Sequence, residues 1–209
     1  MLEEVAMAEV PMLAQDANIP RVMINVESVG LSSEQFFRLC CDNPDLRLEL
    51  TAQKELIVMS PTNSKTGMLN AEIIYQLKHW AKQDGRGVAF DSNAGFTLSN
   101  GAKRSPDASW MLRRRWDALT PAEKARFAPI CPDFVLELWS PSEILKELQF
   151  KMSEYIASGA QLGFLIYPPK QQVYVFRPDE APQCLDQPSA VSGNPELPDF
   201  TLELTEIWK

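Results

Sequence analysis

The sequence has very little histidine and no paired cysteine pattern, which excludes several common kinds of site. Its 209 residues include one histidine, His79, and four cysteines, Cys40, Cys41, Cys131 and Cys184. The cysteines form no C-x-x-C pair and no zinc spacing, and one histidine cannot supply a histidine metal cluster. A Ser-His-Asp hydrolase would have to depend on His79, and the chain contains no nucleophile-elbow motif. Zinc and serine-hydrolase chemistry therefore have no support.

The chain also lacks glycine-rich phosphate loops and long apolar runs. Neither G-x-x-x-x-G-K-[ST] nor G-x-G-x-x-G occurs, so a nucleotide cofactor has no support. No segment approaches the roughly 18 consecutive apolar residues of a membrane span. Acidic residues Glu3, Glu4 and Glu9 lie where a signal peptide would carry basic ones, and we therefore expect a cytoplasmic protein.

Basic charge is in deficit over the whole chain but not everywhere. Twenty basic residues face 28 acidic ones, a net charge of −8, which is not typical of a protein that binds nucleic acid permanently. Between residues 101 and 126 the balance reverses, with Lys103, Arg104, Arg113, Arg114, Arg115, Lys124 and Arg126. This segment is either a solvated face or a patch that contacts phosphates, and both interpretations stay open.

Two apolar segments each carry one carboxylate. Residues 134–139 are almost continuously apolar around Glu137, which predicts a strand covered on both faces. A carboxylate there is costly to bury unless it is paired, hydrogen-bonded or metal-bound. The alternative is an edge strand with Glu137 in water. The second segment, DASWML, begins at Asp107 after Pro106 and predicts a neighbouring strand, although Asp107 alone would also suit a turn.

A helix is expected directly after the Glu137 strand. Ser140, Pro141 and Glu143 predict its start, as a cap, a first-turn proline and a capping box. An apolar stripe follows, made of Ile144, Leu148, Met152, Tyr155 and Ile156. Lys151 lies on the flank of this stripe and Gln149 borders the other side. A lysine there can simply extend along apolar surface, but two acids and a lysine together indicate a divalent-metal site for phosphodiester chemistry.

Three sequence stretches carry a family resemblance: RSPDASW, CPDFVLELWSPS and LQFKMSEYIASGAQLGFLIYP. They resemble the Uma-two family of nuclease-like proteins, within the restriction-endonuclease-like PD-(D/E)xK superfamily, from about Val29 to the C-terminus. The resemblance implies that Asp107 and Glu137 occupy the metal-binding acid positions. The short E-x-K of the superfamily would place a lysine at Trp139, so Lys151 corresponds to a lysine moved to the next helix.

A third acid is expected in or near the first hairpin. LRLEL at residues 46–50 alternates, and LIVMS at residues 56–60 is its predicted partner strand. Composition alone favours a solvent-facing Glu49, whereas the family resemblance implies that an acid of this hairpin belongs to the site. Glu72 is the competitor, on a long helix predicted over about residues 67–83. Glu49 is the preferred candidate.

The order of elements predicts an α/β fold with a restriction-endonuclease-like core. We expect a central mixed sheet flanked by helices, with N- and C-terminal hairpin extensions, and with the Asp107 and Glu137 strands adjacent. Residues 29–209 would form this single domain, and residues 1–28 a loosely held arm.

The expected function is metal-dependent hydrolysis of DNA phosphodiester bonds. Asp107 and Glu137 would bind Mg²⁺ or Mn²⁺, since carboxylate oxygens suit these ions. Lys151, Gln149 and Glu49 would complete the catalytic set, and Arg113–Arg115 would contact phosphates. The alternatives are an inactive nuclease-fold scaffold that binds nucleic acid or protein, and a plain interaction module. A homodimer through an exposed hairpin edge is also expected.

Overall fold

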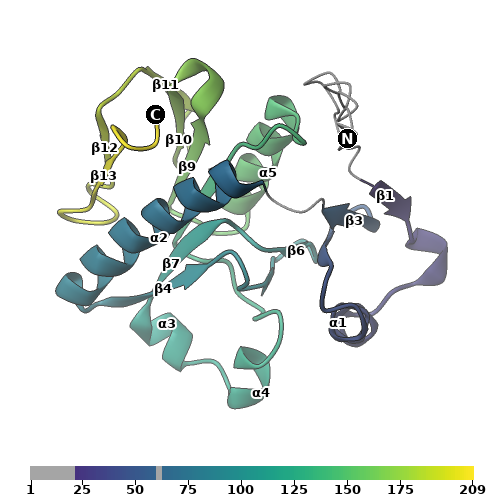
Figure 1. Ribbon diagram of the computed structural model, residues 1–209. Helices are drawn as coiled ribbons and strands as arrows, with labels where there is room; N and C mark the ends of the chain where they lie inside the picture. The colour runs from purple at the N-terminus through teal and green to yellow at the C-terminus, as the bar shows by residue number, and fades with distance from the viewer. Residues whose placement is uncertain (1–21, 60–62) are drawn as a thin grey trace, which may run out of the picture.

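The computed structural model describes residues 22–59 and 63–209, and its centre is a six-stranded mixed sheet, here the main sheet (Figure 1). Its order is β11-β10-β9-β8-β7-β4. These strands are β4 (Gly87–Asp91), β7 (Ala108–Leu112), β8 (Phe134–Leu138), β9 (Leu162–Tyr167), β10 (Gln172–Phe176) and β11 (Gln183–Asp186). β8 and β9 run parallel, and the other neighbours run antiparallel.

Helices cover both faces of the main sheet, as the sequence predicted. Side chains alternate along β8, so Phe134, Leu136 and Leu138 share a core with α2 (Ser64–Asp84). Val135 instead joins the core beneath α5 (Leu145–Ala157). The helix α5 is the crossover between the parallel strands β8 and β9. The predicted mixed sheet flanked by helices and the adjacent strands of Asp107 and Glu137 are confirmed.

The C-terminal extension completes the core on the α2 side. β12 (Ala190–Ser192) and β13 (Thr201–Glu203) pair antiparallel. Val191, Phe200 and Leu202 bury their side chains in the same core as α2. These strands lie at the opposite end of the molecule from α1 (Figure 1).

A second sheet, here the side sheet, has the order β1-β3-β2-β6-β5. Its strands are β1 (Val22–Asn25), β2 (Arg47–Leu50), β3 (Glu55–Met59), β5 (Phe96–Thr97) and β6 (Lys103–Arg104). α1 (Ser33–Asp42) buries Phe36 against Leu48 and Leu50. Its N-terminus has a capping box, because Ser32 Oγ accepts the Gln35 N–H and Gln35 Oε1 accepts the Ser32 N–H.

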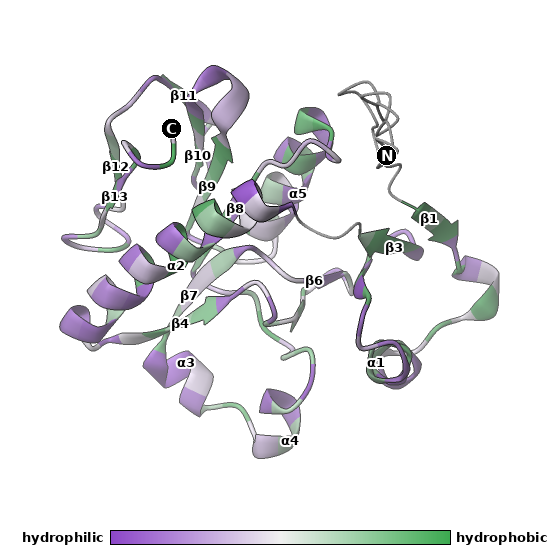
Figure 2. Cartoon of the chain, viewed as in Figure 1, coloured by the Kyte–Doolittle hydropathy of each residue, from purple (hydrophilic) through white to green (hydrophobic). Residues whose placement is uncertain are grey.

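The N-terminal arm was expected to include residues 1–28, but its last residues form regular structure. Most of residues 1–28 lies outside the described residues, but Val22–Asn25 is strand β1, which pairs antiparallel with β3. A short 3₁₀ turn, Glu27–Val29, then leads toward α1. Figure 2 shows β1 and β3 as hydrophobic strands, and this apolar character explains why the segment adds to a sheet.

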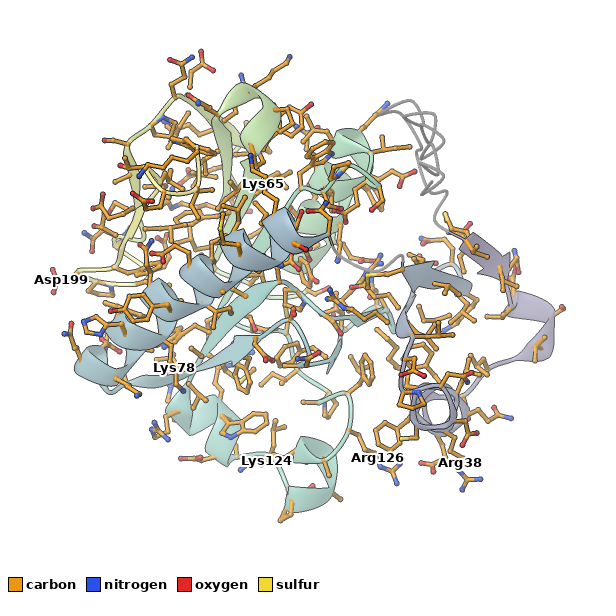
Figure 3. All side chains as sticks on the ribbon, in the orientation of Figure 1. Arg38, Lys65, Lys78, Lys124, Arg126 and Asp199 are labelled. Carbon is orange, nitrogen blue, oxygen red and sulfur yellow. The ribbon has the colours of Figure 1, made fainter. Side chains whose placement is uncertain are left out.

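The basic segment is spread over several elements, and some of its charges are paired within the fold. It builds α3 (Arg113–Asp117) and α4 (Pro121–Lys124), and α4 begins with a Thr120–Glu123 capping box. Arg115 binds the Asp133 carboxylate and the Cys131 carbonyl. Arg126 pairs with Glu34 of α1, and Figure 3 shows Arg126 and Arg38 close together at this edge. Several of these charges therefore hold the fold together.

The helix after β8 begins later than predicted. One of the two contacts of the expected capping box is made, since Ser140 N–H donates to Glu143 Oε2 at 3.0 Å. Ser140 Oγ donates to the same oxygen at 2.8 Å, and the Glu143 N–H donates to the Ser140 carbonyl and not to Oγ. They close a turn, and α5 starts at Leu145. The Glu143 carbonyl accepts the Trp139 indole N–H at 2.9 Å, so it is engaged outside the helical ladder. Ile144 is accordingly 58 % exposed and does not belong to the buried stripe.

A second 3₁₀ turn, Pro168–Lys170, joins β9 to β10.

Among the described residues, no helix combines the length and the apolar composition that crossing a membrane requires.

Candidate active site

A cavity of about 520 Å³ lies between the side sheet, the end of β8 and the helix α5. Its charged residues are Arg47, Glu49, Glu55, Arg104, Asp107, Glu137, Glu143, Lys146, Glu147 and Lys151. They come from segments that are up to a hundred residues apart in the sequence. The two sheets therefore have to be assembled before this site exists.

Glu137 is in the middle of the main sheet, and its side chain is on the α5 face. It is 3 % exposed, and β8 has a neighbouring strand on each side, so the edge-strand alternative is wrong. Oε1 of Glu137 contacts Lys151 Nζ at 2.8 Å and accepts the Tyr155 hydroxyl at 3.0 Å. Lys151 and Tyr155 are four residues apart on α5, so they reach the same carboxylate from one helix face.

Asp107 continues the β7–β8 ladder by its side chain. Ala108 is opposite Leu136 in this antiparallel pair, so one further step of the register brings Asp107 level with Glu137. Asp107 Oδ2 accepts the Leu138 backbone N–H at 2.9 Å. Asp107 is thus anchored to the strand that carries Glu137, and the two carboxylates share one end of the sheet.

Glu49 is buried and not solvent-facing, which corrects the interpretation from composition. It is 2 % exposed and lies on the face of β2 opposite Leu48 and Leu50. Its Oε1 accepts the Ser105 N–H at 2.9 Å and contacts Lys151 Nζ at 2.9 Å. The ammonium group of Lys151 therefore bridges an acid of the side sheet and an acid of the main sheet.

Arg104 and Glu154 form a second layer that the sequence analysis missed. The Arg104 guanidinium donates to Glu49 Oε2 at 3.0 Å and to Glu154 Oε2 at 2.6 Å. Asn100 donates to the other oxygen of Glu154 at 2.9 Å. Arg104 had been counted with the basic patch. A usable signal was the position of Glu154 and Tyr155, which are three and four residues after Lys151 and thus on its helix face.

Two expected residues are not at this site. Gln149 is absent from the residues that line the cavity, because two residues along a helix correspond to a rotation of about 200° from Lys151. Glu72 accepts a hydrogen bond from Gln76 on α2, and Gln76 also binds the Glu203 backbone of β13. Glu72 is therefore on the helix that covers the other face of the main sheet, and Glu49 is the third acid near Lys151.

The three acids differ in their affinity for protons. Burial opposes the ionisation of Glu49, but Lys151, Arg104 and the Ser105 N–H outweigh it and hold the pKa of Glu49 near 2. Burial, together with the charges of Asp107 and Glu49, raises the pKa of Glu137 to about 8 despite Lys151. Burial likewise raises the pKa of Asp107, against the bond from Leu138 N–H.

The lysine is held as a cation. Although burial disfavours the charge, Glu137 and Glu49 raise the pKa of Lys151. In the described part of the chain, no three His, Cys, Asp or Glu side chains are grouped closely enough to bind a metal by themselves. The site thus consists of Asp107 and Glu137 at one end of the main sheet and of the protonated Lys151, which connects Glu137 to the third carboxylate, Glu49.

Comparison with known proteins identifies a family and a shared fold. Residues 33–205 match the family model Uma2, described as "Putative restriction endonuclease". A solved structure described as a "putative nuclease belonging to DUF820", from Anabaena variabilis, has a TM-score of 0.65 and 22 % sequence identity. The alignment covers 77 % of this chain and 89 % of that one, which shows a shared fold. A search of the curated proteins finds no match.

Proposed function

The chain belongs to the Uma2 family, described as "Putative restriction endonuclease". From this premise we propose that it is a metal-dependent endonuclease that hydrolyses DNA phosphodiester bonds. The observation that carries the proposal is the position of Lys151 Nζ, 2.8 Å from Glu137 and 2.9 Å from Glu49. A buried cation at the edge of an acidic cavity is suited to stabilising a negatively charged phosphate in its transition state.

Asp107 and Glu137 would hold Mg²⁺ or Mn²⁺, with the Leu138 carbonyl as a further ligand and Glu49 acting through water. The chemistry of these donors fits, because hard divalent cations prefer oxygen ligands. The raised pKa of Glu137 also fits, since it reflects burial and the negative charges of Asp107 and Glu49, both of which a bound cation would offset. When bound, such an ion lowers the pKa of its water and neutralises charge on the scissile phosphate.

The remaining residues position and restrain this pair. Lys151 would hold the attacking water or stabilise the pentavalent phosphate, since its ammonium is fixed between two carboxylates. Tyr155 holds Glu137 by its hydroxyl, and Arg104 holds Glu49. Glu137 would release its proton when a cation binds, so metal affinity should increase with pH.

A cleavage assay tests the proposal directly. Supercoiled and single-stranded DNA would be incubated with Mg²⁺, Mn²⁺ or EDTA, using wild type, Asp107→Ala, Glu137→Ala and Lys151→Ala. Glu72→Ala is the matched control, an acid outside the site. We expect each site variant to lose about a thousandfold or more in rate, ~4 kcal/mol of barrier. Cleavage that survives EDTA, or that Asp107→Ala leaves unchanged, contradicts the proposal.

An inactive nuclease-fold scaffold is the second candidate. Trp139 occupies the position of the superfamily's short-spaced lysine, and its ring meets Tyr167 edge-on with centroids 5.2 Å apart. A metal titration followed by thermal unfolding separates the candidates. An active site should be stabilised by Mn²⁺ in wild type and not in Asp107→Ala, whereas a scaffold without a metal site shows no shift in either.

A homodimer is a further part of the proposal. β1 is the outer strand of the described side sheet, and Val22 and Ile24 are 52 % and 46 % exposed. An apolar edge strand is suited to pairing with a second copy. Light scattering that gives a mass near 23.6 kDa at high protein concentration would contradict it.

A further inference from the structure

The cavity has an apolar wall as well as a charged floor. Ile57, Met59, Ile144, Leu148 and Phe150 belong to this wall. Phe150 is 66 % exposed and Ile144 is 58 % exposed, so part of the wall is open to solvent at the mouth. Exposed aromatic surface directly beside polar groups is typical of a place where a ligand with a flat apolar part binds.

A cation accompanies this aromatic ring. Lys146 also lines the cavity and is exposed, and it precedes Phe150 by one helical turn of α5. Side chains four residues apart lie on the same helix face. The mouth therefore offers a ring for a base and an ammonium for a phosphate. Lys151, the next residue after Phe150, reaches the floor.

The charge balance of the cavity is unfavourable for a duplex held by its phosphates. Six acidic and four basic residues line the cavity. Duplex binding depends largely on basic contacts to the phosphate backbone. Single-strand binding can instead gain affinity from bases stacked on aromatic side chains. Phe150 supplies such a side chain, so the lining favours a strand with free bases.

The depth of the floor leads to the same conclusion. Glu137 is 3 % exposed and the Lys151 side chain 12 % exposed. A duplex is stiff on the scale of one protein domain. It therefore cannot easily bend to bring one of its phosphates into contact with buried groups. A single strand bends readily, and it can place one phosphate on the floor while the adjoining base remains at the mouth.

We infer that the substrate is an unpaired DNA strand, with one base stacked on Phe150 and the adjoining phosphate over Lys151 and the two acids. This inference rests on the proposed nuclease function and specifies its substrate. Phe150 would determine the preference for single strands, and Lys146 would contact the neighbouring phosphate.

Binding under non-cleaving conditions tests this separately from catalysis. The full chain would be titrated by fluorescence anisotropy into a labelled oligothymidylate in Ca²⁺, with a gel confirming that the strand stays intact. The comparison ligands are a duplex, an abasic strand and an oligouridylate of equal length. We expect the oligothymidylate to bind about tenfold more tightly than the abasic strand, which corresponds to ~1.4 kcal/mol of stacking.

Variants identify the residue responsible. Phe150→Ala should abolish the difference between the oligothymidylate and the abasic strand, and Phe150→Trp should restore it. Tyr75→Ala is the matched control, because Tyr75 is 63 % exposed on α2 and does not line the cavity. Lys146→Ala should weaken binding to all strands and reduce its dependence on salt.

Several results would overturn the inference. They are equal affinity for duplex and single strand, equal affinity for abasic and normal strands, tighter binding of oligouridylate, and no detectable binding of any strand. Unchanged discrimination in Phe150→Ala would also overturn it and would assign the ring to another partner, such as a protein. Failure of the nuclease proposal has a different signature, since then no metal supports cleavage although strand preference in binding persists.

Discussion

Two buried carboxylates near β8 differ in how their charge is compensated. Asp133, just before the strand, is 8 % exposed and accepts one bond from Arg115 at 2.5 Å and one from Leu112 N–H at 2.8 Å. Glu137, near the other end of the strand, is 3 % exposed. It shares the cation of Lys151 with Glu49 and also faces Asp107.

The comparison shows that burial alone does not mark a functional acid. Asp133 has a guanidinium of its own and two bonds to separate oxygens, so its charge is matched. Glu137 shares one lysine with Glu49 and has two acidic neighbours, and burial together with these acidic charges raises its pKa to about 8. An acid with unmatched charge is the one that a cation can stabilise further.

The largest expected effect is on activity. Glu137→Gln removes a carboxylate oxygen that would hold the metal and keeps the shape, so metal-supported cleavage should fall about a thousandfold, ~4 kcal/mol in barrier. The free energy of unfolding should stay equal or increase, since a carboxylate with a raised pKa is lost. Cleavage assays and urea unfolding measure both quantities. A Glu137→Gln protein that cleaves at the wild-type rate would contradict a role of this carboxylate in cleavage.

The matched substitution at the structural acid should give the reverse. Asp133→Asn replaces an acceptor by an amide donor that faces the Arg115 and Leu112 donors. We expect a loss of stability on the order of 2 kcal/mol, with the cleavage rate per folded molecule unchanged. Thermal unfolding beside the cleavage assay checks this, and a thousandfold loss of rate in a folded Asp133→Asn protein would contradict it.

The pH dependence of stability offers a third comparison. Because the pKa of Glu137 is raised to about 8 from an ordinary 4.5, the folded metal-free protein binds more protons than the unfolded one between these values. The contribution of Glu137 to stability should therefore be fully present below about pH 4.5 and be lost as pH rises through about 8. Glu49, with its pKa near 2, acts only below this window.

The contribution of Glu137 is isolated by subtracting the unfolding free energy of the Glu137→Gln variant from that of wild type at each pH. In EDTA, the difference in unfolding free energy should change by about 4 kcal/mol between pH 5 and pH 8.5, against wild type at the higher pH. Urea titrations at several pH values measure it. A difference that stays constant with pH would show that Glu137 is not perturbed.

The smallest expected effect concerns the hydroxyl that holds Glu137. Tyr155→Phe removes the 3.0 Å bond and keeps the buried ring, so we expect about a tenfold loss of kcat and little change in KM. Stability should change by about 1 kcal/mol. Phe164→Leu is a useful control, because it alters the core on the α2 face of the sheet. An unchanged kcat in Tyr155→Phe would make this tyrosine purely a packing residue.

Much of the framework could be predicted from the sequence, because strand and helix patterns are local. The apolar run around Glu137 predicted a central strand, the Pro106–Asp107 step predicted its neighbour, and the stripe of α5 located Lys151. The cap of α1 and the hairpin of β2 and β3 also follow from residues a few positions apart. The hydrophobic periodicity that places these side chains needs no distant partner.

The tertiary structure decided which charges meet. Glu49 reads as a solvent-facing residue until β6 brings Arg104 and Ser105 against it, 55 and 56 residues further along the chain. Gln149 was expected at the site, and the rotation of the helix directs it elsewhere. Arg115 was expected to contact phosphates, and in the structure it forms an ion pair with Asp133.

The physical reason is that the ionisation state of a buried side chain depends on its neighbours in space. The hydrophobic pattern that forms a strand or a helix depends only on residues close together in the sequence. Whether a buried carboxylate is stable, reactive or unable to fold depends on cations and backbone donors within a few ångströms. In this protein those partners come from two sheets and one crossover helix. The sequence alone therefore determined that Asp107, Glu137 and Lys151 are candidates, and only the assembled fold gave Glu137 its unmatched charge.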